Sequence, residues 1–144
     1  MDIISKFYSK YDEENRLLAK SHLPEYLTTM RYIEKYLKPD CKILEIGAGT
    51  GRYSISLAEK GFRIDAVELV EHNIKIMKTK VKPYHKINIY KGNACDLSFI
   101  KSNSYDIVLL LGPMYHLFEE KDKHKAISEA IRVAKNGAVV FAAY

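Results

Sequence analysis

The feature that most constrains the fold of this chain is a regular alternation between short apolar segments and longer segments with helical spacing. Short apolar runs are typical of buried strands, whereas apolar residues that recur every three or four positions are typical of helices. Strands that are separated by helices run parallel within one sheet. The alternation therefore predicts an α/β fold with a doubly wound, mostly parallel sheet flanked by helices.

The expected boundaries follow from apolar periodicity and from the positions of Gly and Pro. We expect strands at residues 41–47, 62–69, 86–92, 105–112 and 138–144. We expect helices at residues 24–37, 52–61, 71–82 and 119–137. The first helix has one apolar face, which consists of Tyr26, Met30, Ile33 and Leu37. The last helix ends at Gly137 and has a packing side that consists of Ala126, Ile127, Ala130, Ile131 and Ala134.

The size and composition agree with a single globular domain. The chain has 144 residues, of which 47% are hydrophobic and 28% charged, and its formal net charge is +5. This balance is that of an ordinary soluble protein, and no apolar run approaches the roughly 20 residues that a membrane helix needs. Cys41 and Cys95 have no closely spaced metal-type partners, so we expect reduced thiols in a cytoplasmic protein without a metal site.

A glycine-rich segment directly follows the first expected strand. Residues 43–54 read ILEIGAGTGRYS, which places Gly47, Gly49 and Gly51 at every second position. Glycines permit a tight turn and a close approach of ligand to backbone, and the next helix directs free N–H groups at the same place. Ligands of such sheets bind beyond the carboxyl ends of the strands, so this loop is the predicted binding site. The spacing differs from the dinucleotide fingerprint G-x-G-x-x-G, and the acid at Glu45 disfavours a pyrophosphate.

The segment LEIGAGTG resembles the first motif of class I S-adenosylmethionine-dependent methyltransferases, and the resemblance extends from Ile33 to Tyr144. It implies a Rossmann-like sheet with the strand order 3-2-1-4-5. It also implies S-adenosylmethionine as the cofactor and S-adenosylhomocysteine as the product. The cofactor-binding residues that it implies in this segment are Glu45, Gly47, Ala48, Gly49 and Gly51. A Gly-rich turn in another doubly wound protein is the alternative interpretation.

Glu68 and Leu69 end the second expected strand. A carboxylate at this point can accept hydrogen bonds from both ribose hydroxyls. The resemblance gives Glu68 that role and gives Leu69 a contact with the adenine. A solvated acid at a strand end is the alternative for Glu68.

The segment GNACDL follows the third expected strand, where the resembled family has Gly-Asp-Ala. The resemblance implies that Asn93 accepts a hydrogen bond from the adenine amino group and that the Ala94 N–H serves a ring nitrogen. Asp96 is a second candidate for the adenine contact. Gly and Asn also favour a turn by themselves, which is the alternative.

The segment LLLGPMYHLF follows the fourth expected strand, where the transferable methyl group should lie. By the resemblance we expect Leu111 to contact the cofactor and Tyr115 and His116 to be catalytic. The tetrapeptide GPMY resembles a motif of nucleobase amino methyltransferases but lacks its first polar side chain, which disfavours nucleobase N-methylation. His116 could take a proton from the acceptor because imidazole titrates near neutral pH. Alternatively, His116 starts the next helix.

We expect residues 1–38 to form an N-terminal helical lid and residues 39–144 to form the cofactor-binding core of a single domain. If the lid folds over the ligand, Tyr11 contacts the cofactor and Arg16 faces its methionyl carboxylate. A solvated amphipathic helix with surface ion pairs is the alternative.

Together the motifs predict an S-adenosylmethionine-dependent methyltransferase that acts by SN2 transfer, with a small-molecule acceptor favoured over nucleic acid or protein. The alternatives are an NAD-dependent oxidoreductase and a non-catalytic module that binds the cofactor or a nucleic acid. The resembled fold has seven strands, whereas we expect five in this chain, the last at residues 138–144. We therefore expect strands 6 and 7 to be absent and the chain to be truncated at its C-terminus. The edge strand at residues 138–144 would then present unpaired backbone groups for self-association.

Overall fold

The computed structural model describes residues 23–143, except for the side chain of Tyr115. In this part of the chain, five parallel strands form one sheet in the order β3-β2-β1-β4-β5. The strands are β1 (Lys42–Ile46), β2 (Arg63–Glu68), β3 (Ile87–Lys91), β4 (Tyr105–Leu110) and β5 (Ala134–Ala142). The predicted fold class and strand order are therefore confirmed.

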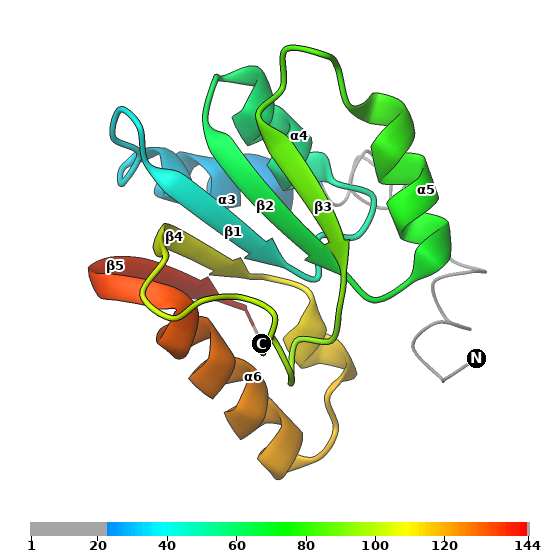
Figure 1. The fold of residues 1–144 in the computed structure, drawn as a ribbon, viewed down its shortest axis with the longest axis vertical. Coiled ribbons are helices and arrows are strands. Elements are labelled where there is room, and N and C mark those ends of the chain that lie inside the picture. The colour runs from blue at the N-terminus through cyan, green and yellow to red at the C-terminus, as the bar shows by residue number, and fades with distance from the viewer. Residues whose placement is uncertain (1–22, 144) are drawn as a thin grey trace.

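Helices cover both faces of the sheet, with α6 on one side and the other α-helices on the opposite side (Figure 1). The helices are α3 (Leu23–Glu34), α4 (Arg52–Glu59), α5 (Glu71–Lys80), the 3₁₀ helix η1 (Pro113–His116) and α6 (Glu120–Val133). Neighbouring residues of β1 serve opposite layers, since Leu44 packs in the layer of α6 and Ile43 in the layer of α3 and α4. Both side chains are fully buried, which explains the continuous apolar character of the strand.

Helix α3 belongs to the core of the domain. Its predicted apolar face is buried at Tyr26, Met30 and Ile33, and the Tyr26 hydroxyl lies 2.6 Å from the Ser56 Oγ of α4. The described part of the expected lid thus packs against α4 and the sheet. The remainder of that segment, including Tyr11 and Arg16, lies outside the described residues.

The end of α6 differs from the prediction. The helix ends at Val133 and β5 begins at Ala134, because Ala134 pairs with Tyr105 at the start of β4. The register then shifts, so that Ile107 pairs with Val139 and the residues between bulge outward. Gly137, predicted to end the helix, lies within β5 with φ +83°. Ile131 was predicted on the packing side of the helix but is 61% exposed.

No helix among residues 23–143 has the length and apolarity needed to cross a membrane. In the same part of the chain, no three His, Cys, Asp or Glu side chains gather in a way that could hold a metal ion.

Candidate cofactor site

The carboxyl ends of four neighbouring strands surround one pocket. Its wall consists of Gly47, Glu68, Leu69, Gly92, Asn93, Ala94, Gly112, Pro113, His116 and Leu117. The sequence-predicted site residues among them are Gly47, Glu68, Leu69, Asn93, Ala94 and His116. The chain leaves β1 toward β2 and leaves β4 toward β5, so the pocket lies where the winding of the sheet reverses direction.

The three glycines after β1 adopt left-handed backbone conformations, as a tight turn requires. Their φ angles are +74° at Gly47, +61° at Gly49 and +90° at Gly51. A Cβ at Gly47 would lie 2.4 Å from Cγ of Pro113, and a Cβ at Gly51 would lie 2.5 Å from Cγ of Met77. At these two positions, glycine makes room for a neighbouring side chain of the protein, which the sequence pattern did not reveal.

The backbone N–H groups of the glycine loop bind protein acceptors. Those of Gly47 and Ala48 donate to the Val67 carbonyl at 2.8 and 3.0 Å, and that of Gly51 donates to the Ala48 carbonyl at 3.0 Å. The Gly49 N–H donates to Oε2 of Glu68 at 2.5 Å. The loop is thereby tied to the end of β2, and these four donors are not directed at a phosphate.

Glu68 is the buried carboxylate of the pocket wall. It is 5% exposed, and its Oε1 accepts hydrogen bonds from the N–H groups of Leu69 and Val70 at 2.9 and 3.0 Å. Burial raises the pKa of Glu68 above its ordinary value of 4.5, while the backbone donors, Val70 and Gly49 among them, act in the opposite direction. Three donors occupy fewer acceptor positions than a carboxylate offers, so Glu68 can accept further hydrogen bonds from a ligand.

Glu45 lies beneath the glycine loop rather than in the pocket wall. It is 2% exposed and accepts a hydrogen bond from Oγ of Ser54 at 2.6 Å, which fixes the first turn of α4. Alternation along β1 directs it toward α4, on the same face as Ile43. Strand alternation could have predicted this direction if the face that α4 covers had been known.

Several other predicted site residues also lie outside the pocket wall. Ala48 packs with Ala66 and Met77, and Leu111 packs in the layer of α3 and α4. Gly49 and Gly51 shape the loop through their left-handed backbone and do not line the pocket. The side chain of Tyr115, predicted to be catalytic, is not among those described.

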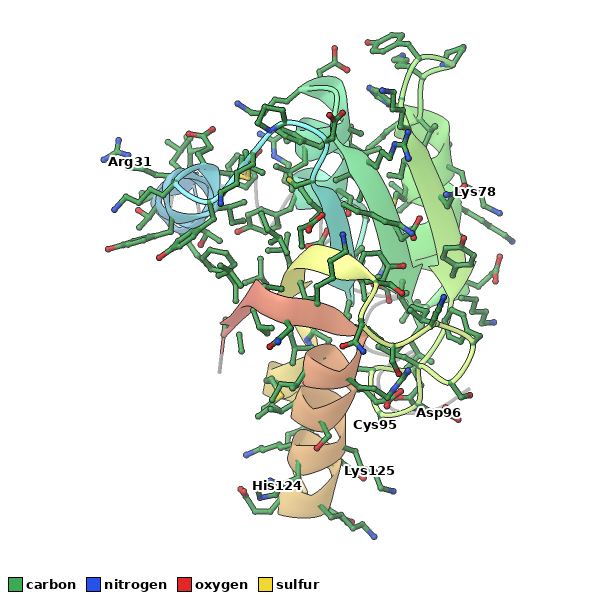
Figure 2. The ribbon with its side chains drawn as sticks, turned by 60° about the vertical axis from the view of Figure 1, so that its left-hand side comes forward. Arg31, Lys78, Cys95, Asp96, His124 and Lys125 are labelled. Atoms are coloured by element: carbon green, nitrogen blue, oxygen red, sulfur yellow. The ribbon has the colours of Figure 1, made fainter. Side chains whose placement is uncertain are left out.

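The loop after β3 presents Asn93 and Ala94 to the pocket. The Asn93 Oδ1 accepts a hydrogen bond from the Cys95 N–H at 2.9 Å, so its carbonyl oxygen is already engaged within the loop. Asp96 is exposed, and hydrogen bonds from the Ser98 side chain and from the Ser98 N–H, the latter at 3.1 Å, lower the pKa of Asp96. Figure 2 shows Asp96 and Cys95 next to each other beside α6. Asp96 therefore stabilises the turn and does not line the pocket.

The segment after β4 closes the pocket. Pro113 begins η1, and His116 ends it with a partly buried side chain in the pocket wall. Leu117 follows His116 and adds an apolar contact surface, which no sequence signal predicted. Pro113 carries such a signal in retrospect, because a Gly-Pro pair directly after a buried strand marks an abrupt turn at the binding edge.

The wall of the pocket is mostly apolar and carries a few polar groups that differ in chemistry. Leu69, Ala94 and Leu117 supply apolar surface, Glu68 supplies hydrogen-bond acceptors, and His116 supplies a group that can exchange a proton. Such a combination is typical of a site for a small organic ligand. It suits a ligand with a flat apolar part and adjacent hydroxyl groups.

Residues 43–137 match the model of a family described as methyltransferase domain. The chain therefore belongs to this methyltransferase family, and the resemblance to class I S-adenosylmethionine-dependent methyltransferases is confirmed. The match extends from β1 into β5 and so includes every residue of the pocket wall.

Individual proteins support this assignment. The chain is 26% identical over 143 residues to a demethylmenaquinone methyltransferase of Lysinibacillus sphaericus, covering 96% of this chain and 58% of that protein. It is 28% identical over 96 residues to an rRNA adenine N-6-methyltransferase of Limosilactobacillus reuteri, covering 67% of this chain and 37% of that protein. A crystal structure of a SAM-dependent methyltransferase from Methanosarcina mazei superposes with a TM-score of 0.69 at 27% identity, covering 76% of this chain and 55% of that one. The chain thus spans 58% or less of each protein.

Proposed function

We propose that this chain binds S-adenosylmethionine in the pocket at the carboxyl ends of β1 to β4 and transfers its methyl group to a small-molecule acceptor. The observation that carries the proposal is the convergence of Glu68, Asn93, Ala94 and His116 on one pocket, in a chain of the methyltransferase family. These residues come from three separate segments of the sequence, and the parallel sheet brings them to one edge.

The residues of the pocket fit an adenosine group. Glu68 would accept hydrogen bonds from the ribose hydroxyls, since its burial and its backbone donors hold the carboxylate in one orientation. Leu69 and Ala94 would contact the faces and edge of the adenine. Because Oδ1 of Asn93 accepts from the Cys95 N–H, we assign its amide Nδ2 the contact with an adenine ring nitrogen. This assignment differs from the acceptor role that the resemblance implied.

Bound S-adenosylmethionine would supply an activated methyl group: its S–CH₃ bond would break as the acceptor–CH₃ bond forms, and S-adenosylhomocysteine would remain. His116 would take the proton that the nucleophilic oxygen or nitrogen of the acceptor releases. Leu69 and Leu117 would exclude water from that part of the pocket. The principal contribution of the protein is the alignment of the two reactants.

NAD binding is disfavoured by the chemistry of the glycine loop. The N–H groups of Gly47, Ala48, Gly49 and Gly51 bind protein acceptors, so these four donors do not face a pyrophosphate. Calorimetric titrations of S-adenosylmethionine, S-adenosylhomocysteine and NAD decide between these functions. We expect heat from the first two ligands, whereas binding of NAD alone would refute the proposal.

The acceptor is proposed to be a small molecule. A demethylmenaquinone methyltransferase aligned over 96% of this chain supports that class, whereas the rRNA adenine methyltransferase aligns over 67%. The alignment covers 58% and 37% of these two relatives, so each has further residues outside the shared part. Transfer of a radiolabelled methyl group to the small-molecule fraction of a cell extract is the expected result. Labelling confined to RNA would favour a nucleic-acid acceptor, and labelling confined to protein would favour a protein acceptor.

Three further proposals concern a lid, self-association and cellular location. We propose that the part of the expected lid that precedes α3 contacts the cofactor through Tyr11 and Arg16. We also propose that β5, an edge strand of the sheet, mediates self-association. Both described cysteines are free, which fits the cytoplasmic location that we propose. Sedimentation velocity over a range of concentrations should show dimers that Ala142→Lys weakens, because a charge opposes pairing at an exposed edge. A concentration-independent monomer would contradict the proposed association.

A further inference from the structure

The segment between β3 and β4 carries part of the pocket but contains no helix of its own. Its first residues, Gly92, Asn93 and Ala94, line the pocket. Local contacts within the segment are short turns, such as the Asp96 N–H to the Asn93 carbonyl at 3.0 Å. A segment without regular structure needs contacts from elsewhere to hold a ligand-binding group in place.

Helix α6 supplies these contacts through two charged side chains. Oε2 of Glu129 accepts a hydrogen bond from the Leu97 N–H at 2.6 Å. Nη2 of Arg132 donates to the Leu97 carbonyl at 2.7 Å, and its Nη1 donates to the Ile100 carbonyl at 2.9 Å and to Oγ of Ser102 at 3.0 Å. Both backbone groups of Leu97 are thus held by α6, three residues after Ala94.

The two side chains also hold each other. Nε of Arg132 lies 2.8 Å from Oε1 of Glu129, and Nη2 lies 3.0 Å from Oε2, which is a paired, two-point contact. Hydrogen bonding to Arg132 holds the pKa of Glu129 below its ordinary value, so Glu129 stays ionised at neutral pH. The planar guanidinium reaches three segments at once, namely its own helix, Leu97 and residues 100–102. A lysine ammonium has no such fork.

The glycine loop and Glu68 make no hydrogen bond to Glu129 or Arg132. The Gly49 N–H donates to Glu68, and the N–H groups of Gly47 and Ala48 donate to the Val67 carbonyl beside it. A disturbance of the contacts from α6 would therefore displace the loop at residues 93–97 and leave Glu68 in place.

We propose that Arg132 and Glu129 are positioning residues for base recognition, and that they act by fixing the loop at residues 93–97 against α6. This inference rests on the proposed function, since it assigns the adenine end of the cofactor to Asn93 and Ala94. Neither charged side chain lines the pocket, so each acts through the backbone of Leu97.

The test compares Arg132→Lys with a matched control, Glu120→Gln. The control removes an exposed ion pair of the same helix, between Glu120 and Lys123 at 3.4 Å, which does not contact the loop. Calorimetry gives the dissociation constants of S-adenosylhomocysteine and of S-inosylhomocysteine, which differs only at the base. Losing one base contact should weaken S-adenosylhomocysteine binding about tenfold in Arg132→Lys and reduce the preference between the two ligands by a similar factor. The control should match the parent protein.

The preference between ligands distinguishes positioning from a general loss of stability. A smaller folded fraction weakens both ligands by the same factor and leaves their ratio unchanged. Hydrogen exchange at the Cys95 and Leu97 amides, which donate to Asn93 and Glu129, provides a second measurement, and we expect faster exchange there in Arg132→Lys. An unchanged ratio together with unchanged exchange would overturn the positioning role while leaving the proposed function intact. A parent protein that binds neither ligand would refute the proposed function and this inference with it.

Discussion

Replacing Gly47 by Ala tests the contact between the glycine loop and η1. A Cβ at this position would lie 2.4 and 2.6 Å from Cγ and Cδ of Pro113, which is closer than carbon atoms can approach. The rigid proline ring cannot rotate away, so η1 must move, and His116 lies at its other end. Gly61 provides the matched control, because its φ of +94° is also left-handed but no atom lies within 4 Å of a Cβ there.

The structure separates two contributions to the cost. The left-handed backbone should cost about 1–2 kcal/mol of unfolding free energy when alanine replaces either glycine. The collision with Pro113 should add about 1–3 kcal/mol at Gly47 alone. We therefore expect Gly61→Ala to cost about 1–2 kcal/mol and Gly47→Ala to cost about 2–5 kcal/mol.

Urea unfolding of four proteins checks this reasoning: the parent, Gly47→Ala, Pro113→Ala and the double variant. Removing the ring should recover the collision energy, so the double variant should be about 1–3 kcal/mol more stable than the sum of the single effects. Equal unfolding free energies for Gly47→Ala and Gly61→Ala would refute the collision. Strict additivity in the four-protein cycle would refute it independently.

Four further predictions concern the pocket and its support. Glu68→Gln places an amide NH₂ against at least one of three backbone donors. It should lower the unfolding free energy in urea by about 1–3 kcal/mol and weaken S-adenosylhomocysteine binding. Equal urea midpoints for the variant and the parent would contradict the role of Glu68. His116→Ala should lower turnover about 10²-fold or more at nearly unchanged cofactor affinity, and unchanged turnover would exclude a proton-accepting role. Asn93→Asp puts an acceptor oxygen in place of Nδ2. If Nδ2 donates to the base, calorimetry should show S-adenosylhomocysteine binding weakened about tenfold. Tighter binding would instead support the acceptor role that the resemblance implied for Asn93. Glu129→Gln should reduce the loss of unfolding free energy at acid pH. The folded pKa of Glu129 lies below 4.5, so the contribution of Glu129 to stability is lost as pH falls through that folded pKa. An unchanged dependence of the unfolding free energy on pH would contradict this.

Apolar periodicity was sufficient to predict the sheet. Ile43, Leu44, Val108 and Leu109 are all fully buried, and a strand buried on both faces in alternation with helices has few possible arrangements. The end of α6 could not be predicted in this way. Ala134 continues the helical pattern, and only its pairing with Tyr105 ends the helix there.

The candidate site was predictable where a residue acts from the end of a strand. Glu68 ends β2, and Asn93 and His116 lie in the segments that follow β3 and β4, so sequence order and the parallel sheet were enough to bring them together. The face of the sheet toward which a side chain points was harder to predict. Glu45 also lies near a strand end, yet it faces α4 and is bound to Ser54. A strand that is apolar on both faces gives no signal for which face a single acid takes.

The supporting residues could not be predicted because their contacts are distant in sequence. Glu129 and Arg132 stand three positions apart on a charged helix, and this spacing also fits an ordinary surface ion pair. Both side chains also hydrogen-bond the backbone of Leu97, which lies more than 30 residues earlier in the chain. Contacts that are distant in sequence also occupy the N–H groups of Gly47, Ala48 and Gly49 in the glycine loop. Its N–H groups already hold β2 and Glu68, so the loop contributes to the pocket through the carboxylate that it fixes, and that carboxylate suits a ligand with hydroxyl groups.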